Sequence, residues 1–120
     1  MQVSVEFSWQ EIGALRLEDG KLRFPNAPDA PGAYCFDLGN HFYIGETDRL
    51  RRRFQHYRTP GPSQPTNLRL NAKALELLES GRVIVISVVT EAVVTVDQAA
   101  SALDLRLKSA RLLVESVIPR

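Results

Sequence analysis

Residues 32–57 hold the side chains with the most evident chemistry. Two short apolar segments carry one tyrosine each, Tyr34 and Tyr43, and an arginine-rich segment follows directly. The basic residues of that segment are Arg49, Arg51, Arg52, Arg53, His56 and Arg58. Guanidinium groups gathered on one element attract phosphates even when the net charge of the protein is near zero. The stretch therefore indicates contact with a phosphate-bearing ligand, and the alternative is a solvated helix face.

The composition is typical of an ordinary globular protein. The chain has 120 residues and a net charge of +1, with 44% hydrophobic and 24% charged residues. This length predicts one domain over residues 1–120, with an N-terminal extension over 1–31 and a core over 32–118. We expect a cytoplasmic protein without a membrane partner, because no apolar run approaches about 20 residues and no secretory signal is recognisable. Cys35 lacks neighbours for a disulfide or a zinc site and is expected to be a small strand residue.

The two tyrosines are predicted to lie on a β-hairpin. Residues 33–38 and 41–44 form its strands, and Gly39-Asn40 is a strong signal for a two-residue turn. This turn predicts three facing pairs, Leu38 with His41, Phe36 with Tyr43 and Tyr34 with Gly45. Because side chains alternate along a strand, the three aromatic residues should share one face, and Cys35 and Ile44 the other.

Two helices are predicted after the hairpin. Thr47 is the expected N-cap of the first, and the breaker-rich segment 59–63 ends it. Its apolar face recurs with helical spacing at Leu50, Phe54 and Tyr57. The second helix is expected to start at Thr66 or Asn67 and to stop before Gly81.

A buried strand and a long helix are predicted for the last third of the chain. Residues 83–89 are nearly all apolar and β-branched, which is typical of a strand at the centre of a sheet. A final helix is expected from Val96 or Asp97 to about Ile118. Its predicted core positions are Leu103, Leu107, Leu113 and Val117.

The N-terminal region is predicted to add short elements. Residues 2–9 alternate as in a strand, Ser8 and Glu11 have the spacing of a capping box that opens one helical turn, and residues 22–24 form a short strand. Together the segments predict an α+β fold. Its centre would be a small mixed or antiparallel three-stranded sheet, joined by short N-terminal strands and flanked by helices.

Two tripeptides give the sequence a resemblance to the GIY-YIG endonuclease superfamily. They are Gly32-Ala33-Tyr34 and Tyr43-Ile44-Gly45. Leu50 and Arg53 follow Gly45 by five and eight residues, and Tyr57 lies one turn further on, as in that family. The predicted order of elements over residues 31–117 is also that of the family fold. Eight residues separate Tyr34 from Tyr43, fewer than is common in the family, but removing one residue from each strand keeps the pair facing.

The resemblance implies a metal-dependent endonuclease, a hydrolase that cuts DNA phosphodiester bonds with one Mg²⁺ or Mn²⁺ ion. In the family, a glutamate on the helix after the third strand holds the metal. The candidates are Glu76, Glu79 and Glu115. Only Glu115 follows the predicted third strand, with Asp97 and Asp104 as weaker alternatives on the same helix. Without the resemblance, Glu115 would be interpreted as a solvent-facing acid.

The resemblance also implies roles for the hairpin and the basic helix. Tyr43 would be the general base or its relay, aided by Tyr34 and by Tyr57 or His56, since nearby cations lower the pKa of a phenol. Arg53 would contact the scissile phosphate. Further contacts to nucleic acid would come from Arg49, Arg51, Arg52, Arg58, Asn67 and Arg69.

One departure from the family leaves an alternative open. The family often has an asparagine beyond the glutamate, and this sequence ends at Arg120. Asn67 and Asn71 could face the cleft, or could be a cap and a loop ligand. The alternative is therefore a catalytically weak or inactive nucleic-acid-binding GIY-YIG module, and a third hypothesis is a protein-interaction domain. DNA is the expected partner, with a targeting protein or a second copy of the chain supplying specificity.

Overall fold

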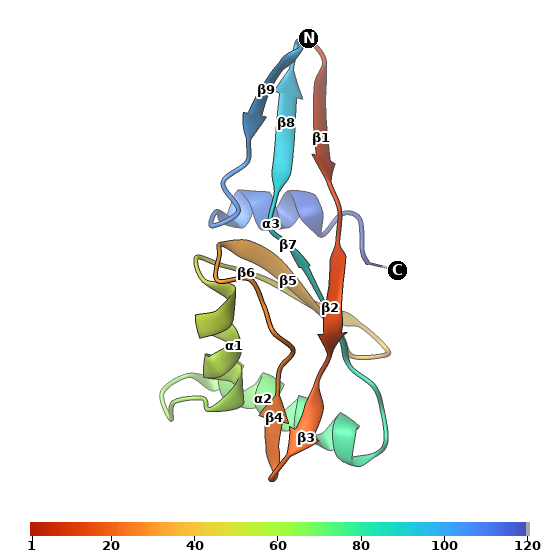
Figure 1. Cartoon of the computed structure of the whole chain (residues 1–120), viewed down its shortest axis with the longest axis vertical. Coiled ribbons are helices and arrows are strands. Elements are labelled where there is room, and N and C mark those ends of the chain that lie inside the picture. Colours follow the sequence, from red (N-terminus) through yellow and green to blue (C-terminus); the bar gives the residue numbers. More distant parts are fainter. Residues whose placement is uncertain (120) are drawn as a thin grey trace.

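Four antiparallel strands in the order β2-β7-β5-β6 form the centre of the protein (Figure 1). This computed structural model describes residues 1–119. The strands of the central sheet are β2 (Gln10–Ala14), β5 (Gly32–Asp37), β6 (Phe42–Thr47) and β7 (Val85–Val89). The last three are the predicted central strands, and β2 adds a fourth by pairing with β7. The α+β fold class is confirmed, with an antiparallel sheet.

The β5–β6 hairpin has the predicted register. Phe36 pairs with Tyr43, and Tyr34 pairs with Gly45. The Leu38 amide donates to the His41 carbonyl at 3.0 Å and so closes the predicted two-residue turn. Its first residue has a φ of 89°, which explains the glycine at position 39.

Helices α1 (Leu50–Arg58) and α2 (Pro65–Glu79) pack on one face of the central sheet. The predicted apolar face of α1 is confirmed, because Leu50, Phe54 and Tyr57 are all buried. On the sheet side, the rings of Tyr34 and Phe36 meet them, with centroid separations of 5.5–5.9 Å. Aromatic edge-to-face packing at such distances stabilises the contact beyond its buried area.

The starts of both helices differ from the predictions. Thr47 ends β6, and Arg49 occupies the N-cap position of α1, although the Thr47 hydroxyl accepts the Arg49 amide at 3.2 Å. Pro65 is the first residue of α2, so Thr66 and Asn67 lie within its first turn. Proline is favoured at this position because its missing N–H would have no helical partner there.

Helix α3 (Lys108–Val114) packs on the opposite face of the sheet. Its buried residues Ala110 and Val114 join Ala33 of β5 and Val89 of β7 in a second apolar cluster. Within the described residues, no helix is long and apolar enough to cross a membrane.

The first half of the predicted C-terminal helix is wrong. Residues 92–102 form a hairpin of β8 (Ala92–Val96) and β9 (Ala99–Ala102), and Asp97 and Gln98 make its turn with φ values of 48° and 74°. The β-branched run 93–96 favours a strand, and aspartate tolerates the left-handed region. Because the helix starts only at residue 108, its buried positions also differ from the predicted ones. Leu107, Leu113 and Val117 are exposed and Leu103 is partly buried, while Leu105, Ala110 and Val114 are buried.

The N-terminal strand β1 (Val3–Phe7) pairs with β8 in a second sheet of order β1-β8-β9. This sheet projects beyond the central one (Figure 1), and the molecule measures 52 × 28 × 22 Å. The predicted helical turn after Ser8 is wrong, because residues 10–14 pair with β7 around a bulge. The short strand expected at 22–24 is found as β4 (Lys21–Arg23), which pairs with β3 (Arg16–Glu18).

Candidate functional site

Three tyrosine hydroxyls meet where α1 covers the central sheet. The hydroxyl oxygens of Tyr34 and Tyr57 are 2.6 Å apart, and the Tyr57 hydroxyl donates to that of Tyr43 over a long 3.4 Å. Tyr34 and Tyr57 are only 1% exposed, whereas Tyr43 is partly exposed. The hydroxyls therefore form a chain from the core to the surface, and Tyr43 is the member that a ligand can reach.

The glycines of the two tripeptides make room for this packing. A Cβ on Gly45 would lie 2.5 Å from Cζ of Tyr34, the residue that faces it across the hairpin. A Cβ on Gly32 would lie 2.8 Å from the carbonyl oxygen of Val89. Both distances are far below van der Waals contact, so the bare backbone at each position is a packing requirement.

Burial keeps the two inner hydroxyls protonated. It raises the pKa of Tyr34 to about 12, although the hydrogen bond with Tyr57 and the charge of Arg53 act in the opposite direction. Burial also raises the pKa of Tyr57, and the neighbouring Tyr34 adds to the rise. For this inner pair, the arginines do not produce the lowered phenol pKa expected from sequence, because desolvation outweighs their attraction. Both phenols are neutral hydrogen-bonding groups at pH 7.

Arg53 brings an uncompensated positive charge to the tyrosines. Burial alone would lower the pKa of its guanidinium, but the neighbouring hydroxyl groups of Tyr34, Tyr57 and Tyr43 raise it, so the group is charged at all working pH values. Within residues 1–119, Arg53 has no ion-pair partner. A half-buried guanidinium next to surface-reaching hydroxyls is suited to binding an anion with several oxygens, such as a phosphate.

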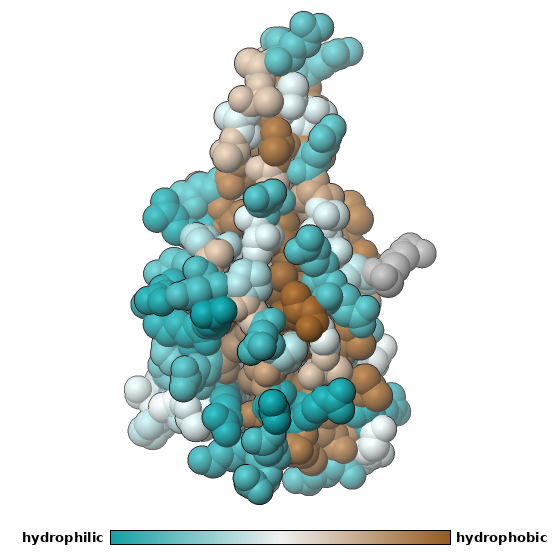
Figure 2. Space-filling model, in the orientation of Figure 1, coloured by the Kyte–Doolittle hydropathy of each residue, from teal (hydrophilic) through white to brown (hydrophobic). Residues whose placement is uncertain are grey.

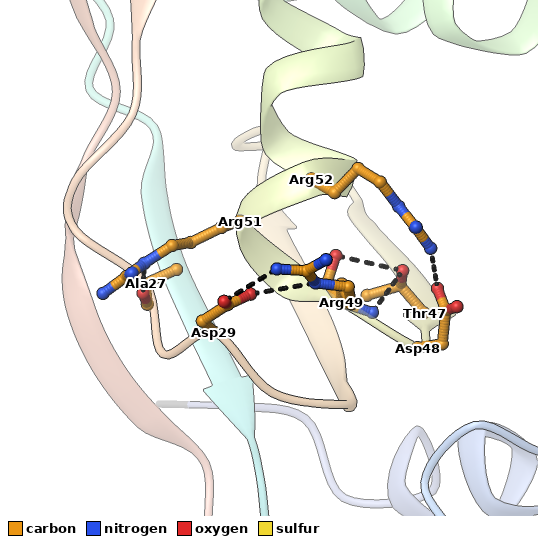
Figure 3. Close-up of polar contacts among 7 residues, drawn as sticks. All are labelled: Ala27, Asp29, Thr47, Asp48, Arg49, Arg51 and Arg52. Carbon is orange, nitrogen blue, oxygen red and sulfur yellow. Dashed lines mark hydrogen bonds and ion pairs between the residues drawn. The ribbon is translucent and has the colours of Figure 1, made fainter.

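The other arginines of the basic segment are not equivalent (Figure 3). Arg49 holds Asp29 through two hydrogen bonds of 3.1 and 2.8 Å, and its guanidinium lowers the pKa of that carboxyl. Arg52 pairs with Asp48 at 2.6 Å and lowers its pKa in the same way. Hydrophilic side chains gather over α1 (Figure 2), but two of these cations are already neutralised by neighbouring acids.

Arg51 and Arg58 keep their charge. Arg51 points away from Arg52 toward the segment before β5, where its Nε donates to the Ala27 carbonyl at 2.7 Å (Figure 3). A carbonyl fixes the side chain without cancelling its charge. Arg58 is exposed and has no acidic partner within the described residues.

The remaining polar candidates from the sequence make no hydrogen bond to the tyrosine hydroxyls within the described residues. His56 is exposed on α1, and within residues 1–119 its ring makes no hydrogen bond. Asn67 donates to Gln64 at 3.1 Å, and Arg69 reaches Thr66 at 3.4 Å. Asn71 is the loop ligand that one alternative predicted, because its amide donates to the carbonyl of Tyr57 at 2.6 Å.

Glu115, the preferred acidic candidate, lies at the end of α3 on the other face of the sheet. Glu115 is the partly exposed C-cap residue of α3, and within the described residues no hydrogen bond or ion pair joins its carboxylate to Tyr43 or Arg53. The weaker alternatives are not on this helix, as the sequence had suggested. Asp97 accepts the Gln2 amide in the β8–β9 turn, and Asp104 pairs with Arg106 before α3.

Glu46 is a residue that sequence reasoning missed. It lies on β6, the edge strand of the sheet, and points to the face opposite Tyr43. Its Oε2 is 3.0 Å from Nε of Arg111, one turn before Glu115, and both side chains are 24% exposed. The Nε–H of Arg111 is not aligned for a hydrogen bond, so this contact is one of charge. The sequence held one signal for this position. Because side chains alternate along a strand, Glu46 must lie on the face opposite Tyr43.

The donor set fits a metal that takes few protein ligands. Within residues 1–119, no group of three histidine, cysteine, aspartate or glutamate side chains could hold an ion by itself. Mg²⁺ commonly uses one or two carboxylates and completes its shell with water and substrate phosphates. Glu115, with Glu46 joined to the same helix by its contact with Arg111, matches that pattern.

Comparison with solved structures places the fold beside that of EndoII from bacteriophage T4, represented by a mutant. The two chains align with a TM-score of 0.59 over 92% of this chain and 89% of EndoII, at 17% sequence identity. EndoII is a GIY-YIG-type endonuclease, so the predicted GIY-YIG-like fold is confirmed. Neither the family models nor the curated proteins gave a match to the sequence.

Proposed function

We propose that the protein is an endonuclease that hydrolyses DNA phosphodiester bonds with the help of a divalent metal ion. The observation that carries the proposal is the uncompensated charge of Arg53 beside three hydrogen-bonded tyrosines, of which Tyr43 reaches the surface. The shared fold with EndoII, a GIY-YIG-type endonuclease, supports the same conclusion.

Arg53 would bind the non-bridging oxygens of the scissile phosphate. Phosphodiester hydrolysis develops negative charge on these oxygens, and a fixed cation stabilises that charge without reorganising. The planar guanidinium offers a fork of donors that matches two phosphate oxygens. Because no acid pairs with Arg53 in the described chain, its full charge is available to the substrate.

Tyr43 would accept or relay the proton of the attacking water. Its hydroxyl is the outer end of the chain that Tyr57 and Tyr34 continue into the core. The inner two stay protonated, so they orient the Tyr43 hydroxyl and cannot act as bases themselves at pH 7. We propose no role in proton transfer for His56, which is exposed and makes no hydrogen bond to these hydroxyls within the described residues.

Glu115 would hold the metal ion from the α3 side of the edge strand. The ion, when bound, supplies a Lewis acid that stabilises the leaving oxygen. Glu46 is the second carboxylate on that side, and Arg111 keeps it paired until a cation or substrate competes for it.

Contacts to the DNA backbone on either side of the cut would come from α1 and α2. We expect Arg51 and Arg58 to contribute more than Arg49 and Arg52, because acids already neutralise the latter two. Asn67 and Arg69 would add weaker polar contacts. A targeting protein or a second copy of the chain would supply sequence specificity.

A plasmid-nicking assay with Mg²⁺ or Mn²⁺ tests the proposal. Arg53→Ala and Glu115→Ala should each lower the nicking rate by about 10²–10³-fold, the loss typical for removing one charge-stabilising group. Arg82→Ala is the control, because Arg82 is exposed and lies outside the site. Nicking that survives both changes would contradict the proposal.

A second candidate function is nucleic-acid binding without cleavage. The separation of Glu115 from the tyrosine cluster, with no polar contact between them in the described residues, favours this alternative. It predicts DNA binding that weakens steeply with salt and no nicked product with either metal.

A further inference from the structure

A cavity of about 320 Å³ lies between α1 and the segment that follows β4. Arg51, Gln55 and Arg58 line it from α1, whereas Arg53 does not. Residues 51, 55 and 58 share one side of a helix, about half a turn away from residue 53. The cavity is therefore separate from the tyrosine site and has no part in the chemistry proposed there.

Two guanidinium groups give the cavity its charge. Arg51 is held in place by the Ala27 carbonyl through its Nε, so its two terminal nitrogens are fixed and free to donate (Figure 3). Arg58 stands one helical turn beyond Gln55 without an acidic partner in the described chain. The acid that lines the cavity, Glu18, is occupied by an ion pair with Arg23. Positioned cations of this kind bind phosphate oxygens.

An aromatic wall faces these charges. The ring of Phe24 stacks on that of Phe54, with centroids 5.0 Å apart and planes at 15°. Phe54 is buried and Phe24 is partly exposed, so Phe24 is the ring that a ligand can meet. The exposed side chains of Asn26 and Gln55 add amides that both donate and accept hydrogen bonds.

We infer that this cavity binds one nucleotide unit of the nucleic acid, with its phosphate on Arg51 and Arg58 and its base against Phe24. The inference rests on the proposed function for the identity of the ligand. A flat aromatic face offers stacking to any base, and the amides can meet polar groups at the base edge. The volume lies at the lower end of the range for pockets that bind small organic ligands, which suits a single nucleotide.

Fluorescence titration with 2-aminopurine 5′-monophosphate tests this inference, because stacking quenches the base. We expect saturable quenching, competition by 5′-deoxynucleoside monophosphates, and much weaker competition by inorganic phosphate or by a nucleoside without phosphate. Arg58→Ala should weaken binding about 10-fold, the loss of one charged hydrogen-bonding partner. Phe24→Leu should keep the apolar contact with Phe54 and reduce the quenching. Arg82→Ala should change neither.

Three results would overturn the inference: no saturable quenching, equal competition by nucleoside and nucleotide, or unchanged affinity in Arg58→Ala. Plasmid nicking on the same samples separates this inference from the proposed function. If the wild type nicks plasmid but does not bind the nucleotide, the cavity is not a nucleotide site and the nuclease proposal stands. If the wild type binds the nucleotide but does not nick plasmid with either metal, the nuclease proposal fails and the cavity remains a nucleotide site.

Discussion

The edge strand β6 presents different chemistry on its two faces. On the α1 face, Tyr43 joins a hydroxyl chain whose other members, Tyr34 and Tyr57, belong to the core. On the α3 face, Glu46 pairs with Arg111, and the side chains of both residues are 24% exposed. Arg111 lies one helical turn before Glu115. Core packing therefore fixes the groups proposed to act on protons and phosphate, which are the tyrosines and Arg53. The carboxylates proposed for the metal, Glu46 and Glu115, are partly buried and keep some exposure to solvent.

Core packing also joins stability to function on the α1 face. A change to the tyrosines or to the glycines beneath them should alter folding before it alters chemistry. Breaking the Glu46–Arg111 pair on the α3 face should cost less than placing a side chain on Gly45, because both charged side chains keep 24% of their exposure to water. Four variants test this comparison, from the largest expected effect on the free energy of unfolding to the smallest.

Gly45→Ala should destabilise the protein most, by about 3 kcal/mol, because the new methyl group would overlap the buried ring of Tyr34. Urea unfolding measures the loss. Gly61→Ala is the matched control, since its Cβ would meet only the flexible end of Gln64 at 3.4 Å. Equal stability of the two variants would show that the α1 face is not tightly packed.

Glu46→Ala should lower the free energy of unfolding by about 2 kcal/mol, because it leaves the largely buried Arg111 without its counter-charge. Arg111→Ala should cost a similar amount. In a double-mutant cycle, the combined variant should lose less than the sum of the two single losses. Strictly additive losses would mean that the pair does not couple α3 to the edge strand.

Tyr34→Phe should cost about 1 kcal/mol near neutral pH, because it removes the 2.6 Å partner of the buried Tyr57 hydroxyl. The pH dependence gives a sharper test. Folding raises the pKa of Tyr34 from the ordinary 10 to about 12, so above pH 10 the unfolded chain releases this proton first. Stability should therefore fall as pH rises through this window, by up to about 1.4 kcal/mol per pH unit for one such group.

Urea unfolding of the wild type and of Tyr34→Phe between about pH 9 and 11 makes the comparison. The variant should lose less stability over this range than the wild type, because one of its two buried phenols is gone. Parallel curves for the two proteins would contradict the assignment of Tyr34 as a buried, neutral group.

Asp29→Ala should have the smallest effect on stability, below about 1 kcal/mol, because its pair with Arg49 is exposed. It should steepen the dependence of DNA affinity on salt by about one unit of log–log slope, since Arg49 becomes available to a phosphate. Asp104→Ala removes a similar surface pair in the segment before α3 and should leave the slope unchanged. The same slope in both variants would mean that Arg49 does not approach DNA.

The α1 face could be predicted from sequence because local signals determine it. A two-residue turn fixes the hairpin register, and the register then fixes which side chains share a face. Tyr34, Tyr43 and Gly45 therefore lie where the turn predicted. The apolar face of α1 followed in the same way from its spacing.

The parts that could not be predicted depend on contacts distant in sequence. The pairing of β2 with β7 joins residues 10–14 to residues 85–88 and leaves no local trace. The contacts of Arg49 with Asp29 and of Arg51 with Ala27 are of the same kind. The raised pKa of Tyr34 follows from burial, which composition and spacing do not report.

The β8–β9 hairpin was missed for a different reason. Leu103 and Leu107 have helical spacing, so the sequence predicted a helix from residue 96 or 97, where the structure has the turn and second strand of a hairpin. The choice moved the start of the last helix by about three turns. Glu115 still lies at the end of that helix, so its proposed role survives the error.

A crystal of the protein soaked in Mn²⁺ tests the central claim most directly, because anomalous scattering locates the ion. We expect an ion on the Glu115 carboxylate, at the β6 edge, with Tyr43 and Arg53 facing the same open space. An ion bound elsewhere, or Glu115 directed away from that edge in the presence of Mn²⁺, would contradict it.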